Sequence, residues 1–353
     1  MPAFLSPTVR SRAERAAAWV LALALGATGL AQSAPLDLET AWSRAPEVSA
    51  DVATRRNDLE VAARTAARTD RDPLATGLER LQATQALQAA EASLAAAERS
   101  ARASALQAYV AVLQAMDAEA QARTRADLAE RNLAAARVRH EAGAITDLAL
   151  SQSVADAESA VRAARDAATD LDFAWSDLAA VVGLEAAGLR TAGIAATPTD
   201  LPEPPDLAAD LAGLGAGHAG IATAERGLAL ARLRLQGVDH EGSAPNAVSD
   251  ARADVASAER RVDDARRSAA QQLRTAHQNL LVAYGRVHDA RVADAAAGTT
   301  LDAQRVRWEA GELSPIAWQQ AQLDRERAAS SLRAAIHGAW TAWLRYEQAR
   351  AGG

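Results

Sequence analysis

Histidine is the side chain best suited to metal binding and to proton transfer near neutral pH, so the search for chemistry starts there. No two histidines lie three or four positions apart, which is the spacing that would place two ligands on one helix face. The chain contains six: His140, His218, His240, His277, His288 and His337. There is no cysteine, and no nucleophile elbow or glycine-rich phosphate loop surrounds a serine or an acidic residue. The sequence therefore predicts no catalytic residue, no metal site and no cofactor, and we expect a protein that is not an enzyme.

A duplicated turn is the most informative local pattern. Residues 137–148 read RVRHEAGAITDL, and residues 305–316 read RVRWEAGELSPI. Each copy joins two long segments rich in alanine, arginine and glutamate. Gly143 and Gly311 stand where a left-handed residue ends a helix, a conformation that glycine adopts without a steric cost. The pattern predicts two tight turns, each joining the two helices of an antiparallel hairpin.

The residues after each glycine predict where the returning helices begin. Thr146 and Ser314 are good N-caps. The first helical residue is then Asp147 in one copy, where a negative charge favours the positive helix end. In the other copy it is Pro315, whose missing N–H is not needed at that position. The two turns are thus alike in backbone design and different in charge.

The repeat extends far beyond the turns. The two glycines are 168 positions apart, and the same offset relates Gln152 to Gln320 and Trp175 to Trp343. Near the N-terminus the offset is 169. The predicted unit of about 150 residues is too long for a solenoid repeat, which spans roughly 20–50 residues. The chain therefore divides into residues 36–187 as a first helical repeat, 188–206 as a proline-rich linker, and 207–353 as a second helical repeat.

Composition favours long helices with narrow seams. Aromatic residues make up 3% of the 353 residues and charged residues 24%, and many of the rest are alanine. Leu87, Leu94 and Ala101 lie seven apart, which is typical of a coiled coil. Pro46 should kink or restart the first helix, and the Asp72–Pro73 pair should start the second. We expect helices over 38–68, 74–140, 146–182, 207–236, 246–309 and 314–350, with short breaks at 69–73 and 237–245.

The N-terminus resembles a secretory signal. Arg10, Arg12 and Arg15 precede an apolar run, and small residues follow, so residues 1–31 are predicted to be a signal peptide cleaved near positions 31–34. An uncleaved anchor is the alternative. The signal carries three arginines and one glutamate, so its removal lowers the formal net charge from −7 by two. An acidic exported protein is a poor candidate for nucleic-acid binding.

Over almost the whole mature chain, the sequence resembles the TolC-like outer-membrane efflux protein family. The resemblance rests on the duplicated unit, on residues 45–47 (APE) and on the two turns, where residues 143–148 (GAITDL) are close to the first tip sequence of the family. It implies a homotrimer whose paired helices form a hollow α-barrel. It also implies hairpin tips that meet a periplasmic adaptor protein and its inner-membrane pump.

Two departures from the family pattern stand out. The family inserts transmembrane β-strands between helices, and a spanning strand needs about 9–11 residues. The breaks at 69–73 and 237–245 are short, polar and without alternation. The predicted fold class is thus all-α: long antiparallel coiled-coil hairpins in two tandem repeats, a TolC-like α-barrel protomer without the transmembrane β-strands. Pro315 also replaces the acidic residue equivalent to Asp147, which puts a ring of carboxylates at the second tip in doubt.

Two functions compete at this stage. The first is a component of an efflux or type I secretion system, exported to the periplasm or outer membrane, that forms part of a periplasmic conduit for small molecules or proteins. The second is a periplasmic or cell-envelope coiled-coil scaffold without transport activity. A conduit requires a closed ring of copies, and a scaffold does not.

The hairpin tips are the predicted partner-binding site. Ile145 and Leu313 occupy equivalent positions beside the caps, and we expect both to be exposed and free to pack into a partner. Trp340, Trp343 and Tyr346 share one helix face and are predicted to pack in the core, with an interfacial belt as the alternative. The predicted tip residues are Gly143, Ala144, Ile145, Thr146, Asp147, Gly311, Glu312, Leu313, Ser314 and Pro315.

Overall fold

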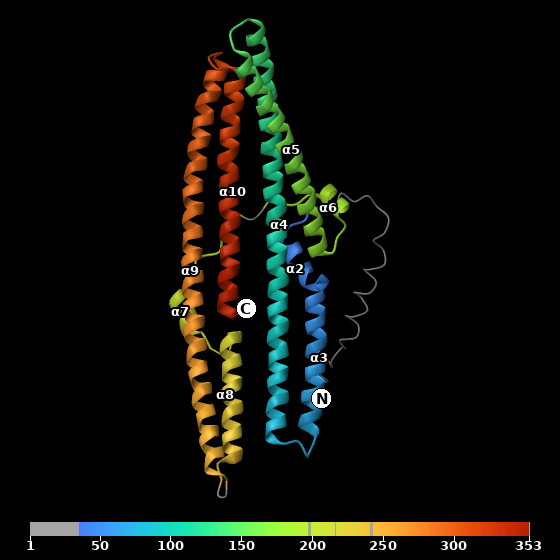
Figure 1. Ribbon diagram of the computed structural model, residues 1–353, viewed down its shortest axis with the longest axis vertical. Helices are drawn as coiled ribbons and strands as arrows, with labels where there is room; N and C mark the ends of the chain where they lie inside the picture. The colour runs from blue at the N-terminus through green and yellow to red at the C-terminus, as the bar shows by residue number, and fades with distance from the viewer. Residues whose placement is uncertain (1–34, 197–198, 216, 241–242, 353) are drawn as a thin grey trace, which may run out of the picture.

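A computed structural model describes residues 35–196, 199–215, 217–240 and 243–352 of the chain (Figure 1). These residues are almost entirely helical, and their only β-type contact is an isolated bridge between Leu36 and Ile194. The predicted signal segment, 1–31, lies outside the described residues. The helices are α2 (Leu38–Val48), α3 (Ala50–Arg71), α4 (Gly77–Glu141), α5 (Asp147–Val182), α6 (Ala186–Ala192), α7 (Leu207–Ala212), α8 (Ala219–Val238), α9 (Pro245–Glu309) and α10 (Pro315–Ala351).

The internal duplication is visible in the helix bounds. Helices α4 and α9 each contain 65 residues, and both of their ends differ by the 168 positions found in the sequence. Helices α5 and α10 begin with the same offset. At 1.5 Å per residue each 65-residue helix is roughly 100 Å long. The predicted all-α class, with two tandem repeats of long antiparallel hairpins, is confirmed.

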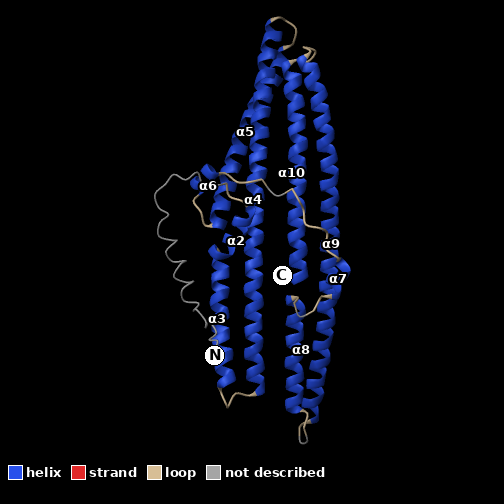
Figure 2. Ribbon diagram, turned by 180° about the vertical axis from the view of Figure 1, so that it is seen from behind, coloured by secondary structure: helices blue, strands red, loops and turns tan. Residues whose placement is uncertain are grey.

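The four long helices lie side by side in the order α9, α10, α4, α5 (Figures 1 and 2). Helix α10 packs on α4 and thereby joins the two repeats. The α4–α5 turn and the α9–α10 turn lie at the same end of the molecule, and the α3–α4 and α8–α9 connections lie at the other. The predicted tips are therefore neighbours in space although 168 residues separate them in sequence.

Each returning helix is continued, end to end, by a shorter helix. Helix α5 stops at Gly183, above α2 and α3, and α10 stops at Gly352, above α8 (Figure 1). Gly183 has φ +65°, and a Cβ there would lie 2.7 Å from Cγ2 of Val48. The Nε–H of Arg44 donates to the carbonyl of Val182 at 3.2 Å. Close approach and a left-handed backbone together require glycine at this junction.

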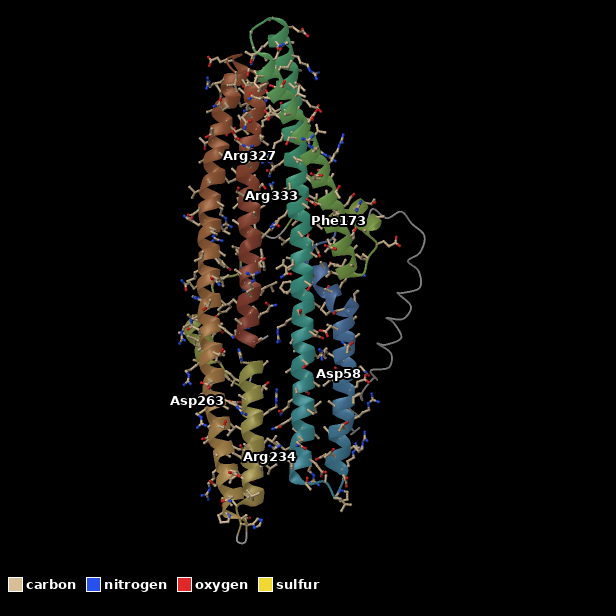
Figure 3. The ribbon with its side chains drawn as sticks, viewed as in Figure 1. Asp58, Phe173, Arg234, Asp263, Arg327 and Arg333 are labelled. Atoms are coloured by element: carbon tan, nitrogen blue, oxygen red, sulfur yellow. The ribbon has the colours of Figure 1, made fainter. Side chains whose placement is uncertain are left out.

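Aromatic side chains fill the region where the repeats meet. The rings of Trp42 and Trp343 lie 6.4 Å apart, and those of Trp340 and Trp343 lie 6.0 Å apart, both edge to face. Tyr346 is fully buried. The core-packing interpretation of this aromatic stripe is confirmed. On the same helix, Arg333 forms an ion pair with Asp117 of α4 at 2.8 Å, and Figure 3 places Arg333 on the side of α10 that faces α4.

The linker between the repeats is fastened along α9. Three α9 side chains seven residues apart donate to its carbonyl oxygens: Arg291 to Thr199 (3.0 Å), Tyr284 to Pro202 (2.5 Å) and His277 to Pro205 (3.3 Å). Tyr109 of α4 is the equivalent of His277. Its hydroxyl is within hydrogen-bonding distance of the carbonyl oxygens of Leu36 (3.0 Å) and Ala195 (2.5 Å). A segment without regular structure thus satisfies its backbone groups on both repeats.

Several predicted boundaries were wrong. Helix α4 begins at Gly77, not at residue 74, because Thr76 and Glu79 form a capping box (Glu79 N to Thr76 Oγ1, 3.2 Å; Thr76 N to Glu79 Oε2, 2.7 Å). Asp72 instead ends α3. The helix predicted over 207–236 is interrupted after Ala212, where glycines are frequent. A short helix, α6, forms beside the linker where none was predicted.

The break predicted at Pro46 falls at Ser49, which caps α3 through the N–H of Val52 (3.4 Å). None of the helices in the described part of the chain has a stretch long and apolar enough to cross a membrane.

Candidate functional site: the hairpin tips

The two tips have the same backbone structure. At the first, the N–H of Gly143 donates to the carbonyl of His140 (2.8 Å) and the N–H of Ala144 donates to the carbonyl of Arg139 (2.8 Å). This hydrogen-bond pair is the Schellman motif, and Gly143 has the positive φ (+69°) that the motif requires. At the second tip, the N–H of Gly311 (φ +74°) donates to the carbonyl of Trp308 at 3.0 Å. The N–H of Glu312 donates to the carbonyl of Arg307, as the N–H of Ala144 does to Arg139 at the first tip.

Both returning helices begin at the predicted caps. The hydroxyl of Thr146 accepts from the N–H of Ala149 at 3.3 Å, and the hydroxyl of Ser314 accepts from the N–H of Ala317 at 3.2 Å. Pro315 is the first residue of α10, as predicted. The local design of the two turns therefore follows from glycine, a hydroxyl cap and helix-compatible flanking residues.

The side chains that span the two turns are chemically different. At the first tip, Nε2 of His140 lies 2.6 Å from Oδ1 of Asp147, which links the two helices of the hairpin. The equivalent of His140 is Trp308, whose ring stacks on that of Trp318. The ring centroids are 6.2 Å apart, and the angle between the ring planes is 9°. The equivalent of Asp147 is Pro315, which has no charge. A polar link at one tip is thus replaced by an aromatic stack at the other.

The prediction that Ile145 and Leu313 are exposed was wrong. Both side chains are half-buried. Leu313 lines a groove between α9 and α10 together with Leu301 and Ala317. Each of the Ile145 and Leu313 side chains is thus partly covered and partly exposed.

Other apolar side chains at the tips are exposed. Val138 is 66% exposed and Val306 is 64% exposed, and the offset of 168 makes them equivalent. Leu148, in the first turn of α5, is 68% exposed. Sequence reasoning missed the valines, although each stands between two arginines in the duplicated RVR motif. That repeated placement of an apolar residue among charges was the available signal.

The ionisable groups of the described tips are arranged for surface contact. Asp147 is almost fully exposed, and His140 is one-third exposed. Across the described residues, no three histidines or carboxylates gather in a geometry that could hold a metal ion. Away from the tips, burial, first of all, raises the pKa of Tyr109 to about 12 at the linker. The tips therefore present both apolar and charged side chains to solvent.

Comparison with known proteins identifies the fold. The chain matches no family model, and it matches no curated protein sequence. Among solved structures, it is similar to the outer membrane protein VceC from Vibrio cholerae (16% identity, 90% of this chain and 96% of that chain, TM-score 0.59). It is also similar to the outer membrane channel CmeC of Campylobacter jejuni (13% identity, 90% and 86%, TM-score 0.60). A membrane protein from Pseudomonas aeruginosa gives 16% identity, 90% coverage of both chains and a TM-score of 0.62.

These similarities cover most of each chain at low sequence identity, so they describe the fold. Two of the three solved structures are named as outer membrane proteins or channels, and none is named as an enzyme. The duplicated hairpins, the collinear helix pairs and the shared end for both tips form one recognisable architecture. The chain has the TolC-like helical fold found in outer membrane channels.

Proposed function

We propose that the protein is a component of an efflux or type I secretion system and forms part of a periplasmic conduit as a homotrimer. Small molecules or proteins would pass through the conduit, and no bond would be made or broken. The observation that carries this proposal is the duplicated, roughly 100 Å long hairpin pair whose two tips lie at one end.

The free edges of the helical layer support assembly into a ring. Helices α5 and α9 are the outermost of the four long helices, and each exposes large apolar side chains (Figure 3 shows Phe173 on α5). Phe173 is 65% exposed on α5, and Val292 is 59% exposed on α9. If the α5 edge of one copy packs on the α9 edge of the next, the contact is heterologous, and such contacts form a ring when the rotation between copies closes. Each apolar edge would then be covered by a neighbour.

The partners follow from the same arrangement. A periplasmic adaptor protein, itself joined to an inner-membrane pump, would contact the tips through Val138, Val306 and Leu148. The protein would be exported, with its predicted signal at residues 1–31, and would act at the periplasm or outer membrane.

Oligomeric state is the direct test of the conduit. Native mass spectrometry of the mature protein is expected to give a trimer. Phe173→Arg and Val292→Arg should each convert the trimer to monomer without a loss of helicity, because exposed substitutions usually change stability by less than about 0.5 kcal/mol. Leu74→Arg, at a side chain 87% exposed in the α3–α4 connection, is the control. A wild-type protein that stays monomeric at every concentration contradicts the proposal.

The tips are tested by transport. In cells that depend on this protein for export, we expect the double substitution Val138→Asp and Val306→Asp to raise accumulation of an exported dye. Leu74→Asp, in the α3–α4 connection at the opposite end of the molecule, should leave accumulation unchanged. Equal effects of the tip and control substitutions would mean that the tips do not dock a partner.

A further inference from the structure

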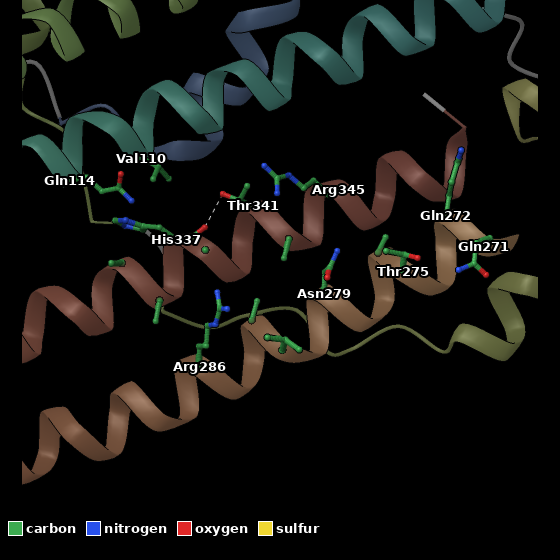
Figure 4. A pocket seen from close by; sticks show the side chains of 17 residues that line it. Val110, Gln114, Gln271, Gln272, Thr275, Asn279, Arg286, His337, Thr341 and Arg345 are labelled. Carbon is green, nitrogen blue, oxygen red and sulfur yellow. Dashed lines mark hydrogen bonds between the residues drawn. The ribbon is translucent and has the colours of Figure 1, made fainter. Parts of the chain in front are cut away.

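A groove with a volume of about 800 Å³ lies between α9 and α10, and Val110 and Gln114 of α4 also line it (Figure 4). Its walls are two antiparallel rows of side chains with helical spacing. The α9 row contains Thr275, Asn279, Val282 and Arg286, and the α10 row contains Ala334, Gly338, Thr341 and Arg345. Each row covers 12 residues, and its two ends lie roughly 16 Å apart along the helix.

The charge of this groove is opposite to that of the protein. The chain carries 45 acidic and 38 basic residues. Among the described residues that line the groove there is no carboxylate, whereas two arginines, Arg286 and Arg345, are present. Four smaller grooves between the helices each contain at least one aspartate or glutamate. Neither Arg286 nor Arg345 forms an ion pair with a carboxylate of the described chain.

The nearest charged cluster does not cancel this charge. His337 borders the groove and interacts electrostatically with Asp117. That carboxylate is paired with Arg333 at 2.8 Å, so its charge is largely neutralised. The two guanidinium groups therefore remain as the source of a local positive potential.

The middle of the groove is apolar and has room for a ligand. Its lining includes Ala334, Ala335, Gly338 and Ala342 of α10 and Val282 of α9. Gly338 is in the interior of α10, and a Cβ built there would meet nothing within 4 Å. Asn279 adds an amide to the lining (Figure 4), while the hydroxyl of Thr341 donates to the carbonyl of His337 at 3.0 Å. Such a combination suits a molecule with an apolar body and an acidic group, because guanidinium binds carboxylate through two parallel hydrogen bonds.

We propose that the groove between α9 and α10 is a binding site for organic anions with an apolar body. The acid group is held by Arg286 or Arg345, and the body covers Val282 and the small residues around Gly338. The groove shares α9 with the proposed ring edge, so binding is measured beside the oligomeric state, and the two proposals can fail separately.

The test uses naphthalene-2-carboxylate as the probe and its neutral amide, naphthalene-2-carboxamide, as the matched control, in calorimetric titrations of the mature protein. We expect the carboxylate to bind at least tenfold more tightly than the amide and to weaken as salt is added. Arg286→Gln and Arg345→Gln should each weaken binding about three- to tenfold, and the double variant more. Arg234→Gln, on α8, is the control for a general loss of charge.

Filling the groove provides a second arm that does not remove charge. Gly338→Leu places a side chain in open space and should abolish binding while leaving the helical signal unchanged, since glycine is a poor residue for a helix interior. Gly285→Leu also meets nothing within 4 Å, lies outside the groove and should bind normally.

Three results would overturn the proposal. They are equal binding of carboxylate and amide, full binding by a folded Gly338→Leu variant, and binding that disappears when the protein associates. The last result would assign the groove to carboxylates of a neighbouring copy.

Discussion

Replacing Gly183 by alanine tests the end-to-end junction between α5 and the shorter helices below it. Alanine at φ +65° adopts a left-handed conformation, which costs about 1–2 kcal/mol. The new methyl group would also lie 2.7 Å and 2.9 Å from the two γ-carbons of Val48, whereas carbon atoms prefer about 3.5–4.0 Å. Overpacking of this kind costs typically about 1–3 kcal/mol. The expected loss in the free energy of unfolding is therefore about 2–5 kcal/mol.

Gly143 offers a matched control because its backbone is similar and its surroundings are open. Its φ is +69°, and a Cβ there would meet nothing within 4 Å. Gly143→Ala should cost only the conformational term, about 1–2 kcal/mol. The difference between the two variants isolates the contact with Val48.

Val48→Ala removes both γ-carbons and should relieve the clash. In the double variant with Gly183→Ala, we expect a favourable coupling of about 1–3 kcal/mol, equal to the overpacking term. Urea unfolding of the mature protein, followed by circular dichroism, gives each free energy. If Gly183→Ala and Gly143→Ala cost the same, or if the coupling is absent, the ends of these helices do not meet as described.

The remaining predictions concern titration, the linker and the second tip. Burial lowers the pKa of His218, whose Nδ1 caps α8, so protonation of this side chain opposes folding. The stability that is present above the unfolded pKa of about 6.5 is lost as the pH falls below that value. His218→Asn should reduce this loss when the free energy of unfolding is measured between pH 7.5 and 5.5. Tyr284→Phe removes the hydrogen bond to the linker and should lower the free energy of unfolding in urea by about 1–2 kcal/mol. No change in this free energy would mean that the linker is not bound to α9 at Tyr284. Trp318→Ala should abolish the ring stack and change the near-ultraviolet circular dichroism, whereas Leu150→Ala, at the equivalent position of the first tip, should not.

Sequence reasoning was most successful where the signal is local. A helix of 65 residues that ends in glycine and restarts after a hydroxyl cap is encoded by its own residues, so α4, α5, α9 and α10 were placed to within about three residues. The constant offset of 168 then implied that both hairpins share one design. The start of α4 was missed because a capping box competed with an equally plausible proline signal four residues earlier.

The candidate site was only partly predictable for the same reason. Gly143, Gly311 and their caps follow from backbone requirements that each turn meets alone. The exposure of a side chain at the tips does not follow from local sequence, because it depends on what the rest of the hairpin covers. Leu313 is half-buried against the hairpin seam, while Val306, only seven positions earlier, projects into solvent.

The sequence by itself determined the helical class, the duplication and the form of both turns, because helix periodicity, capping and glycine act over a few residues. Only the tertiary structure decided how those parts meet. The stacking of α5 on the helices below it, the fastening of the linker along α9 and the groove between α9 and α10 all join residues far apart in the chain. Such contacts depend on the relative placement of whole helices, and narrow alanine seams carry little sequence information about which helices will pack together.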